Sequence, residues 1–310
     1  MTDATEATNA TDDALLLFQQ HRPVLFGIAY RMLGSAADAE DILQDAWLNW
    51  SRVDTAAVAE PRAYLARTVT NLSLNRLKSA TVQRESYVGP WLPEPLVTAP
   101  DASGGIERAE AVSMAMLVVL ESLSPLERAV FILKEVFGFP YAEIAGMLDR
   151  TEASVRQVGT RARGHVQARR PRYEAPAEVR RQATDEFLAA CLGGDLNRMM
   201  ELLAPDVTVW SDGGGKIRAA LRPIVGADKA ARWILGVLAA RIPDVGVHQV
   251  DVNGQPGLLV TSSGVPDNVF VMELDETGIT GIRLVRNPDK LRHVTVPKPP
   301  QDPEAGSGTS

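Results

Sequence analysis

Apolar residues recur at three- and four-residue spacings in two long stretches of the chain, from Asp13 to about Ser79 and from Ile106 to Arg170. This spacing places them on one face of an α-helix, and it predicts two helical domains over residues 13–82 and 108–172. Residues 83–107, which lie between them, lose the pattern and contain prolines at 90, 93, 95 and 100. Because proline-rich sequence is extended and semi-rigid, these residues are predicted to form a linker.

From Glu178 onward the pattern changes to helices followed by short alternating runs. A glycine pair at 193–194 is expected to end one helix, and a second helix is expected to start near Asp195. Strands are predicted at 207–210, 216–221, 245–253, 257–263, 268–274 and 279–285, with a further helix at 227–241. Helices followed by a meander of strands predict an α+β domain over residues 178–296.

Both ends of the chain lack a regular pattern. Residues 1–12 are rich in Thr, Ala and Asp and are predicted to be disordered, and residues 297–310 are predicted to form a flexible tail. The acidic N-terminus resembles neither a signal peptide nor a membrane span, and the chain contains no apolar run of roughly eighteen residues. We therefore expect a cytoplasmic protein without a membrane partner.

Composition narrows the possible chemistry. The 310 residues are 45% hydrophobic and 23% charged, as in an ordinary globular protein. A single cysteine, Cys191, excludes an internal disulfide, and the four histidines show no metal-ligand spacing, so neither a metal site nor a cofactor is predicted. The formal net charge of −7 argues against general coating of nucleic acid, so any such contact must be local.

Positive charge is nevertheless concentrated in one stretch. From Arg150 to Arg172 there are seven arginines and one acidic residue, Glu152. A solvated basic helix face would explain the arginines alone, but the same stretch also has the pattern of a helix-turn-helix. A short helix over 141–148 and a tight connection at 149–151 precede a longer helix at about 152–169.

The longer helix has two distinct faces. Its buried face is predicted to contain Val155, Val158, Ala162 and Val166, and the opposite face small and polar residues such as Gln157 and Thr160. Gln and Arg can hydrogen-bond base edges in the major groove, and arginines can neutralise phosphates. The predicted DNA contacts are Arg150, Thr151, Ser154, Arg156, Gln157, Thr160, Arg161 and Arg163.

Three segments resemble the extracytoplasmic-function (group four) sigma factors of bacterial RNA polymerase. LSPLERAVFILKEVFGFPYAEIAGMLDRTEASVRQVGTRAR, at 123–163, resembles their region four, which binds the polymerase flap and reads the minus-thirty-five promoter element. RPVLFGIAYRMLGSAADAEDILQDAWLNW, at 22–50, resembles region two, and PRAYLARTVTNLSLNRLKSA, at 61–80, resembles the part that melts and reads the minus-ten element. The resemblance implies two all-α domains, a region-two helical bundle and a region-four helix-turn-helix, in a sigma factor that binds core RNA polymerase and directs it to promoter DNA.

The resemblance also implies roles for residues of region two. An acidic, partly apolar helix suits docking on the basic coiled coil of the polymerase clamp, and the implied contacts are Asp41, Gln44, Asp45 and Trp47. Melted promoter DNA is a single strand that cations and amides can hold along its backbone. The implied contacts with it are Arg62, Arg67, Asn71, Asn75, Arg76 and Lys78.

The third domain resembles the SnoaL-like domain, a cone-shaped α+β barrel, and the combination resembles the SigJ-type subgroup of these sigma factors. Three motifs of that subgroup are present: WLPEPL at 91–96, DGGGK at 212–216 and NPDKL at 287–291. The resemblance implies that this domain regulates the sigma factor in cis. We expect the linker to pack on the third domain through Trp91, Leu92, Pro93, Asp212, Gly213, Gly214, Gly215, Lys216, Asn287, Pro288, Asp289 and Lys290.

Two other functions are compatible with the pattern. The first is a cyclase-type enzyme that acts on small molecules, with His248, Asp251, Glu273 and Trp210 on strands that face a cavity. No nucleophile–base signature supports it, so we expect no catalytic residues and no enzymatic activity. The second is a ligand-sensing DNA-binding regulator. This function does not explain the acidic helix at 38–50. An unidentified small ligand in the third domain is compatible with all three.

Overall fold

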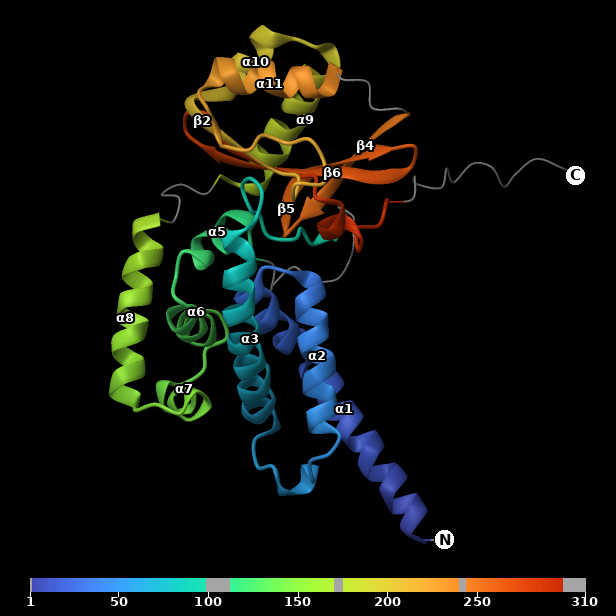
Figure 1. The fold of residues 1–310 in the computed structure, drawn as a ribbon, viewed down its shortest axis with the longest axis vertical. Coiled ribbons are helices and arrows are strands. Elements are labelled where there is room, and N and C mark those ends of the chain that lie inside the picture. The colour runs from blue at the N-terminus through green and yellow to red at the C-terminus, as the bar shows by residue number, and fades with distance from the viewer. Residues whose placement is uncertain (1, 99–111, 170–174, 240–243, 298–310) are drawn as a thin grey trace, which may run out of the picture.

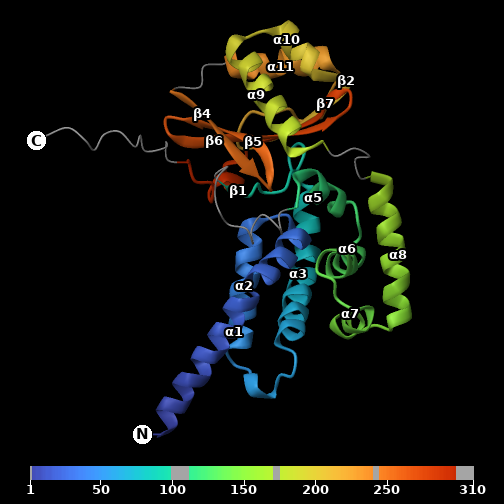
Figure 2. The same ribbon diagram turned by 180° about the vertical axis from the view of Figure 1, so that it is seen from behind.

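The computed structural model describes residues 2–98, 112–169, 175–239 and 244–297. A helical half contains the first two predicted domains, and a sheet with three helices lies at one end of it (Figures 1 and 2). The predicted tail from 298 onward, part of the linker (99–107) and the end of the second domain (170–172) lie outside the described residues. Within those residues no helix is long and apolar enough to cross a membrane.

The first domain is a bundle of three helices, α1 (Thr2–Leu33), α2 (Ala36–Trp50) and α3 (Pro61–Glu85), with a short 3₁₀ turn, η1 (Thr55–Ala57), before α3. Gly34, at a φ of +67°, ends α1, and Ser35 caps α2 by accepting a hydrogen bond from the backbone of Asp38. The expectation of disorder at 1–12 differs from the structure, because α1 starts at Thr2. This segment contains alanines and neither glycine nor proline, so nothing in it ends the helix.

The second domain is the predicted helix-turn-helix with two helices before it. Its elements are α5 (Met114–Glu121), α6 (Pro125–Phe131), the π-helical turn η2 (Ile132–Val136), α7 (Tyr141–Leu148) and α8 (Glu152–Arg169). The side chain of Ser124 and the carboxylate of Glu127 form a capping box at the start of α6. Asp149 adopts the left-handed conformation, with a φ of 52°, and turns the chain between α7 and α8.

The third domain has a seven-stranded sheet in the order β1-β4-β5-β6-β7-β2-β3. Its strands are β1 (Val97–Thr98), β2 (Leu203–Asp212), β3 (Ile224–Val225), β4 (Val245–Val252), β5 (Gln255–Ser262), β6 (Val265–Asp275) and β7 (Gly278–Val285). Helices α9 (Ala177–Gly193), α10 (Leu196–Leu202) and α11 (Ala227–Ala239) cover one face of the sheet (Figure 1). A short 3₁₀ helix, η3 (Pro288–Leu291), follows β7.

Two details of this domain differ from the predictions. The sheet is open rather than a closed barrel, because β1 and β3 are two-residue edge strands that do not pair with each other. The strand predicted at 216–221 is wrong: Gly214 and Gly215 make a turn after β2, and the chain then runs as a loop until β3. β2 pairs with β7 on one side and, at Thr208 and Val209, with β3 on the other, and residues 216–221 pair with neither.

The linker is part of the folded structure. Its residues Val97 and Thr98 form β1 and pair with β4, which the sequence pattern did not predict. A continuous hydrophobic core extends from the helical half through Leu92 of the linker to one face of the sheet, where it includes Val252 and Val271. A second core lies between the other face of the sheet and helices α9–α11. The third domain is therefore joined to the helical half by shared packing.

Candidate polymerase and promoter interfaces

The outer face of α2 has the acidic and apolar character that the sequence predicted. Asp41, Gln44 and Asp45 are exposed, and Trp47 is half-buried one turn further on. The ring of Trp47 meets the ring of Phe18, from α1, edge to face with centroids 5.4 Å apart. The indole is thus fixed by packing.

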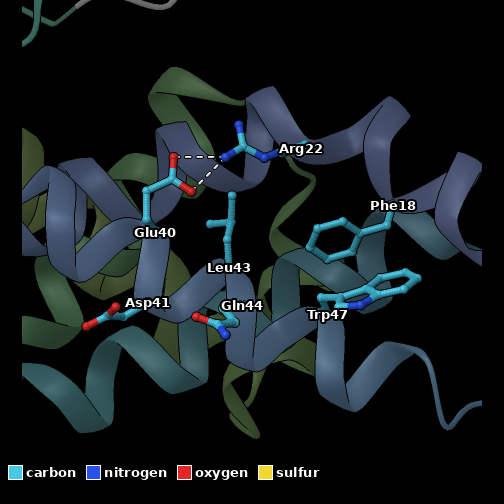
Figure 3. Close-up of a pocket in the computed structure, with 7 residues that line it drawn as sticks. All are labelled: Phe18, Arg22, Glu40, Asp41, Leu43, Gln44 and Trp47. Carbon is cyan, nitrogen blue, oxygen red and sulfur yellow. Dashed lines mark hydrogen bonds and ion pairs between the residues drawn. The ribbon is translucent and has the colours of Figure 1, made fainter. Parts of the chain in front are cut away.

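A shallow hollow of about 250 Å³ lies beside these residues, between α1 and α2 (Figure 3). Its walls come from both helices, and an ion pair of 2.6 Å between Arg22 of α1 and Glu40 of α2 spans it. Sequence reasoning missed Phe18, Arg22 and Glu40 as members of this surface. The sequence could have indicated Glu40, because it is an acidic residue next to Asp41. Only the packing of α1 on α2 shows that Phe18 and Arg22 of α1 belong to the same surface.

The six residues predicted to contact melted DNA lie along α3 and fall into two groups. Arg67, Asn75, Arg76 and Lys78 are exposed, and Arg76 pairs with Asp38 and lies 3.7 Å from Asp41. Arg62 and Asn71 instead contact the second domain. Arg62 donates a hydrogen bond to the carbonyl of Phe137 (3.1 Å), and Asn71 donates one to the carbonyl of Met147 (3.3 Å).

Further contacts hold the second domain against the first. The buried guanidinium of Arg128 donates a hydrogen bond to the carbonyl of Met32, at 2.6 Å. The guanidinium of Arg31 lies over the ring of Phe137, 5.2 Å from its centroid. Gly27 makes this approach possible, because a β-carbon there would lie 2.8 Å from the ring of Phe137. We call this docked state of the two domains the closed arrangement.

Helix α8 presents its predicted DNA-reading face to solvent. Val155, Val158, Ala162 and Val166 are buried, as the helical pattern predicted. Gly159 is buried too, and a β-carbon on it would lie 2.9 Å from the hydroxyl of Tyr141. The opposite face of α8 and the turn before it are open along the outer edge of the molecule (Figure 1). Arg150, Thr151, Arg156, Gln157, Thr160 and Arg161 are exposed, and Ser154 and Arg163 are half-buried.

Weak surface ion pairs orient the arginines of α8. Arg156 pairs with Glu152 and lies over the ring of Tyr141, and Arg163 lies 3.0 Å from Glu135. Arg161 lies 3.7 Å from Glu127, whose pKa is lowered by its hydrogen bonds with Ser124. The two exposed pairs, Arg156–Glu152 and Arg163–Glu135, contribute about 0–1 kcal/mol each, so their arginines can exchange partners at small cost.

The three motifs WLPEPL, DGGGK and NPDKL meet at one buried site. The carboxylate of Asp212 accepts hydrogen bonds from the hydroxyl of Tyr87 (2.6 Å), the amide of Leu92 (2.8 Å) and the ammonium of Lys290 (2.8 Å). Lys290 also donates to the carbonyl of Leu92 and lies 4.0 Å from the ring centroid of Trp91. Burial lowers the pKa of Lys290, and Asp212 acts in the opposite direction.

The remaining motif residues shape this site. Asn287 caps η3 and donates a hydrogen bond to the hydroxyl of Tyr87 (2.8 Å), and Lys216 pairs with Asp289. The glycines allow close packing, because a β-carbon on Gly214 would lie 2.3 Å from the side-chain amide of Asn287. Gly213 and Gly215 are similarly restricted, Pro93 is buried, and Pro288 begins η3. The structure thus joins Leu92 of the linker to Asp212 and Lys290 of the third domain, and the regulatory role of the wider set stays a prediction.

Glu94, also in WLPEPL, makes contacts that the sequence did not reveal. Its side chain is only 8% exposed and accepts hydrogen bonds at the start of α2, from the hydroxyl of Ser35 (2.9 Å) and the amides of Ala36 (2.7 Å) and Ala37 (3.1 Å). The motif therefore contacts the first domain as well as the third. A glutamate between two prolines was the signal, but its partners are about 60 residues away in the chain, too far for a local pattern to show.

The third domain also contains a cavity of about 560 Å³ between α9, α11 and the sheet. Its lining is apolar, with residues such as Phe187, Leu235 and Phe270, and it contains no acidic residue or histidine. Burial raises the pKa of Cys191, in the wall, to about 12, so its thiol is protonated at neutral pH. A bound small ligand here stays a prediction.

The residues considered for a cyclase lie elsewhere. His248, Asp251, Glu273 and Trp210 do not line the cavity. Glu273 instead pairs with the buried Arg283 at 2.5 Å, and Arg283 lies over Trp210, on the sheet face that packs toward the helical half. The described residues contain no group of His, Cys, Asp and Glu that could hold a metal ion. The cavity offers no acid–base pair for catalysis.

An acidic helix, a second helix with cations and amides, and a helix-turn-helix with an open basic face are the features expected of an RNA polymerase promoter-recognition subunit. Residues 17–82 match the Sigma-70 region 2 family, and residues 113–166 match the Sigma-70 region 4 family. The chain is 39% identical over 287 residues to the ECF RNA polymerase sigma factor SigJ of Mycobacterium tuberculosis, covering 88% of this chain and 92% of that protein. The probable ECF sigma factor SigI of the same organism is 30% identical over 283 residues, covering 90% and 95%.

A solved structure supports the same family as the sequence comparisons. The crystal structure of M. tuberculosis SigJ superposes with a TM-score of 0.71 at 34% identity, covering 88% of this chain and 96% of the other. The chain belongs to the extracytoplasmic-function family of RNA polymerase sigma factors. It is a non-enzymatic factor that binds core RNA polymerase and promoter DNA to direct transcription initiation. The predicted fold class of two helical sigma domains followed by a sheet-containing domain is confirmed.

Proposed function

We propose that this sigma factor acts in the cytoplasm, docks on the polymerase clamp through α2, reads the minus-ten element through α3 and the minus-thirty-five element through α8, and is regulated in cis by its third domain. The observation that carries the proposal is the position of WLPEPL. This one motif contacts Asp212 and Lys290 of the third domain on one side and the start of α2 on the other. A change in the third domain therefore reaches the first domain through six residues of linker.

The closed arrangement supports a resting state with low activity. Arg62 and Asn71 lie on the α3 face that would hold melted DNA, and both are engaged by backbone carbonyls of region four. We expect a single strand to use these two side chains fully only after region four moves away, although Arg62 stays exposed in the closed arrangement. The reading face of α8 is open in the same state, so binding of duplex minus-thirty-five DNA is compatible with the closed arrangement.

The third domain has two separable attachments, and they predict opposite effects of two truncations. Truncation after Pro288 removes Lys290 but keeps Asn253, whose side chain contacts Tyr30 of α1 (2.8 Å) and the amide of Leu96 (3.1 Å). It loosens the domain while the linker stays on region two, so we expect higher activity. Deletion of residues 178–310 removes both attachments. The linker then loses the support that keeps it on region two, so we expect lower activity.

Run-off transcription with core polymerase tests the proposal, on a template that carries the promoter of the protein's own gene. The intact chain should give a defined transcript, and Trp47→Ala should reduce it because the docking face loses its central aromatic residue. The truncation after Pro288 should exceed the intact chain, and the chain without residues 178–310 should fall below it. Equal activity of all three chains would contradict regulation in cis, and no transcript from any of them, with no core binding, would contradict the sigma mechanism assigned to α2.

A further inference from the structure

The start of α2 is completed by a residue that is distant in the chain. The first amides of a helix have no partner within the helix, and an acceptor there stabilises the helix, most strongly when it is negatively charged. Ser35 satisfies the amide of Asp38 at 3.0 Å. The carboxylate of Glu94 satisfies the amides of Ala36 and Ala37 and also accepts from the hydroxyl of Ser35. Glu94 is therefore a second cap on α2, supplied by the linker.

The backbone of Glu94 is fixed as firmly as its side chain. Its amide donates to the carbonyl of Gly34 (2.8 Å), and its carbonyl accepts from the hydroxyl of Tyr30 (2.6 Å). The ring of Trp91 covers Gly34 so closely that a β-carbon there would lie 2.8 Å from it. The linker thus holds the turn between α1 and α2 from two sides, by a ring and by a carboxylate.

This turn sets the angle between α1 and α2, and that angle shapes the docking surface. Phe18 and Arg22 come from α1, and Glu40 and Trp47 come from α2, so the surface exists only when the two helices keep this relation. We propose that Glu94 is a positioning residue for polymerase binding: it fixes the start of α2 so that both helices present one docking surface. This inference rests on the proposed docking role of α2.

The test uses the full-length chain and its affinity for core polymerase, measured at a temperature where every variant is folded. Glu94→Ala removes three hydrogen bonds and should weaken core binding about fivefold, the size of a typical capping effect. Glu94→Gln keeps a carbonyl oxygen that can accept from the helix amides, so its affinity should stay within about twofold of the parent. Binding of duplex minus-thirty-five DNA, which uses α8 alone, should be unchanged in both variants.

The matched control is Asp195→Ala, which removes a cap from α10 in the third domain, where Asp195 accepts from the amide of Arg198 at 3.0 Å. It should lower thermal stability as Glu94→Ala does but leave core affinity unchanged, which separates positioning from a general loss of stability. Core binding by Glu94→Ala equal to that of the parent would overturn the inference while leaving the docking role of α2 intact. No binding by the parent itself would overturn both. If Glu94→Ala does not fold, Glu94→Asp, which shortens the side chain by one methylene, replaces it with the same expected loss and the same overturning result.

Discussion

The ammonium of Lys290 donates a hydrogen bond of 2.8 Å to the carboxylate of Asp212, and both side chains are buried between the linker and the third domain. They belong to two motifs that are 78 residues apart in the chain. A buried ion pair of this kind contributes little relative to an apolar pair, but loss of one partner is costly because the other charge stays buried.

Lys290→Ala should therefore destabilise the protein by about 3–5 kcal/mol, since it leaves the Asp212 carboxylate without its cation. Urea unfolding at neutral pH measures the change. The double variant Asp212→Asn with Lys290→Met should be more stable than the single variant, because it buries no unpaired charge. A single variant as stable as the parent would show that the pair does not hold the linker.

The environment of Tyr87 predicts how stability depends on alkaline pH. Burial and the hydrogen bond to Asp212 raise the pKa of Tyr87 above its ordinary value of 10.0. Above pH 10 the unfolded state loses this proton first while the folded state retains it. The contribution of Tyr87 to stability is thus complete below pH 10 and is lost as the pH rises from there toward the folded-state pKa.

Tyr87→Phe removes this titration, so denaturation midpoints measured at a series of pH values above 10 should fall less steeply than in the parent. The buried Tyr30, whose pKa is raised by burial, retains the same dependence in the variant, so the slope should decrease without disappearing. An identical slope in the parent and in Tyr87→Phe would mean that the hydroxyl of Tyr87 is not held in the folded protein as the structure shows.

The exposed guanidinium of Arg161 should read sequence in the minus-thirty-five element. Arg161→Ala should reduce discrimination between the cognate promoter and a variant with a changed base by about 1–3 kcal/mol if this side chain contacts a base. Competition binding with the two duplexes measures the difference. Arg181→Ala removes an equal charge from the exposed surface of α9 and should leave discrimination unchanged. An unchanged preference in Arg161→Ala would show that Arg161 contacts at most phosphates.

Loosening of the closed arrangement should expose α3. Phe137→Ala removes the ring that packs on Arg31 and next to Gly27, so affinity for a single-stranded minus-ten oligonucleotide should rise about fivefold, equivalent to about 1 kcal/mol of lost domain packing. Fluorescence anisotropy measures this affinity. Val136→Ala alters the neighbouring side chain, which is 42% exposed, and should have no effect. Equal single-strand affinity in the parent and in Phe137→Ala would show that region four does not block α3.

The sequence predicted the parts of this molecule that depend on neighbours in the chain. The short helix at 141–148 and the buried face of α8 follow from spacings of three and four residues, and both are found in the structure. The third-domain strands at 245–253 and 268–274 were predicted for the same reason, because alternation marks a half-buried strand. The motif residues around Asp212 were identified by resemblance, and the structure supplies their hydrogen bonds.

The sequence did not reveal features that depend on distant partners. The apolar residues at 216–221 fit an alternating pattern, but they pair with no strand of the sheet and form a loop. Val97 and Thr98 are too few to signal a strand and become one only because β4 offers a free edge. The contact of Arg62 with region four was hidden for a similar reason, because an arginine suited to DNA is equally suited to a backbone carbonyl.

If the third domain regulates the sigma factor as proposed, its place in the same chain fixes the stoichiometry, and the pairing of β1 with β4 fixes its position. Because β1 belongs to the linker between regions two and four, the third domain is attached both through the chain and through its own sheet. A separate inhibitor can be diluted, degraded or outnumbered, whereas a domain held in this way is always present at one copy per sigma factor. The balance between held and released forms is then independent of protein concentration and of expression level. It can be shifted by a partner that binds one of the two forms more tightly, such as core polymerase or promoter DNA.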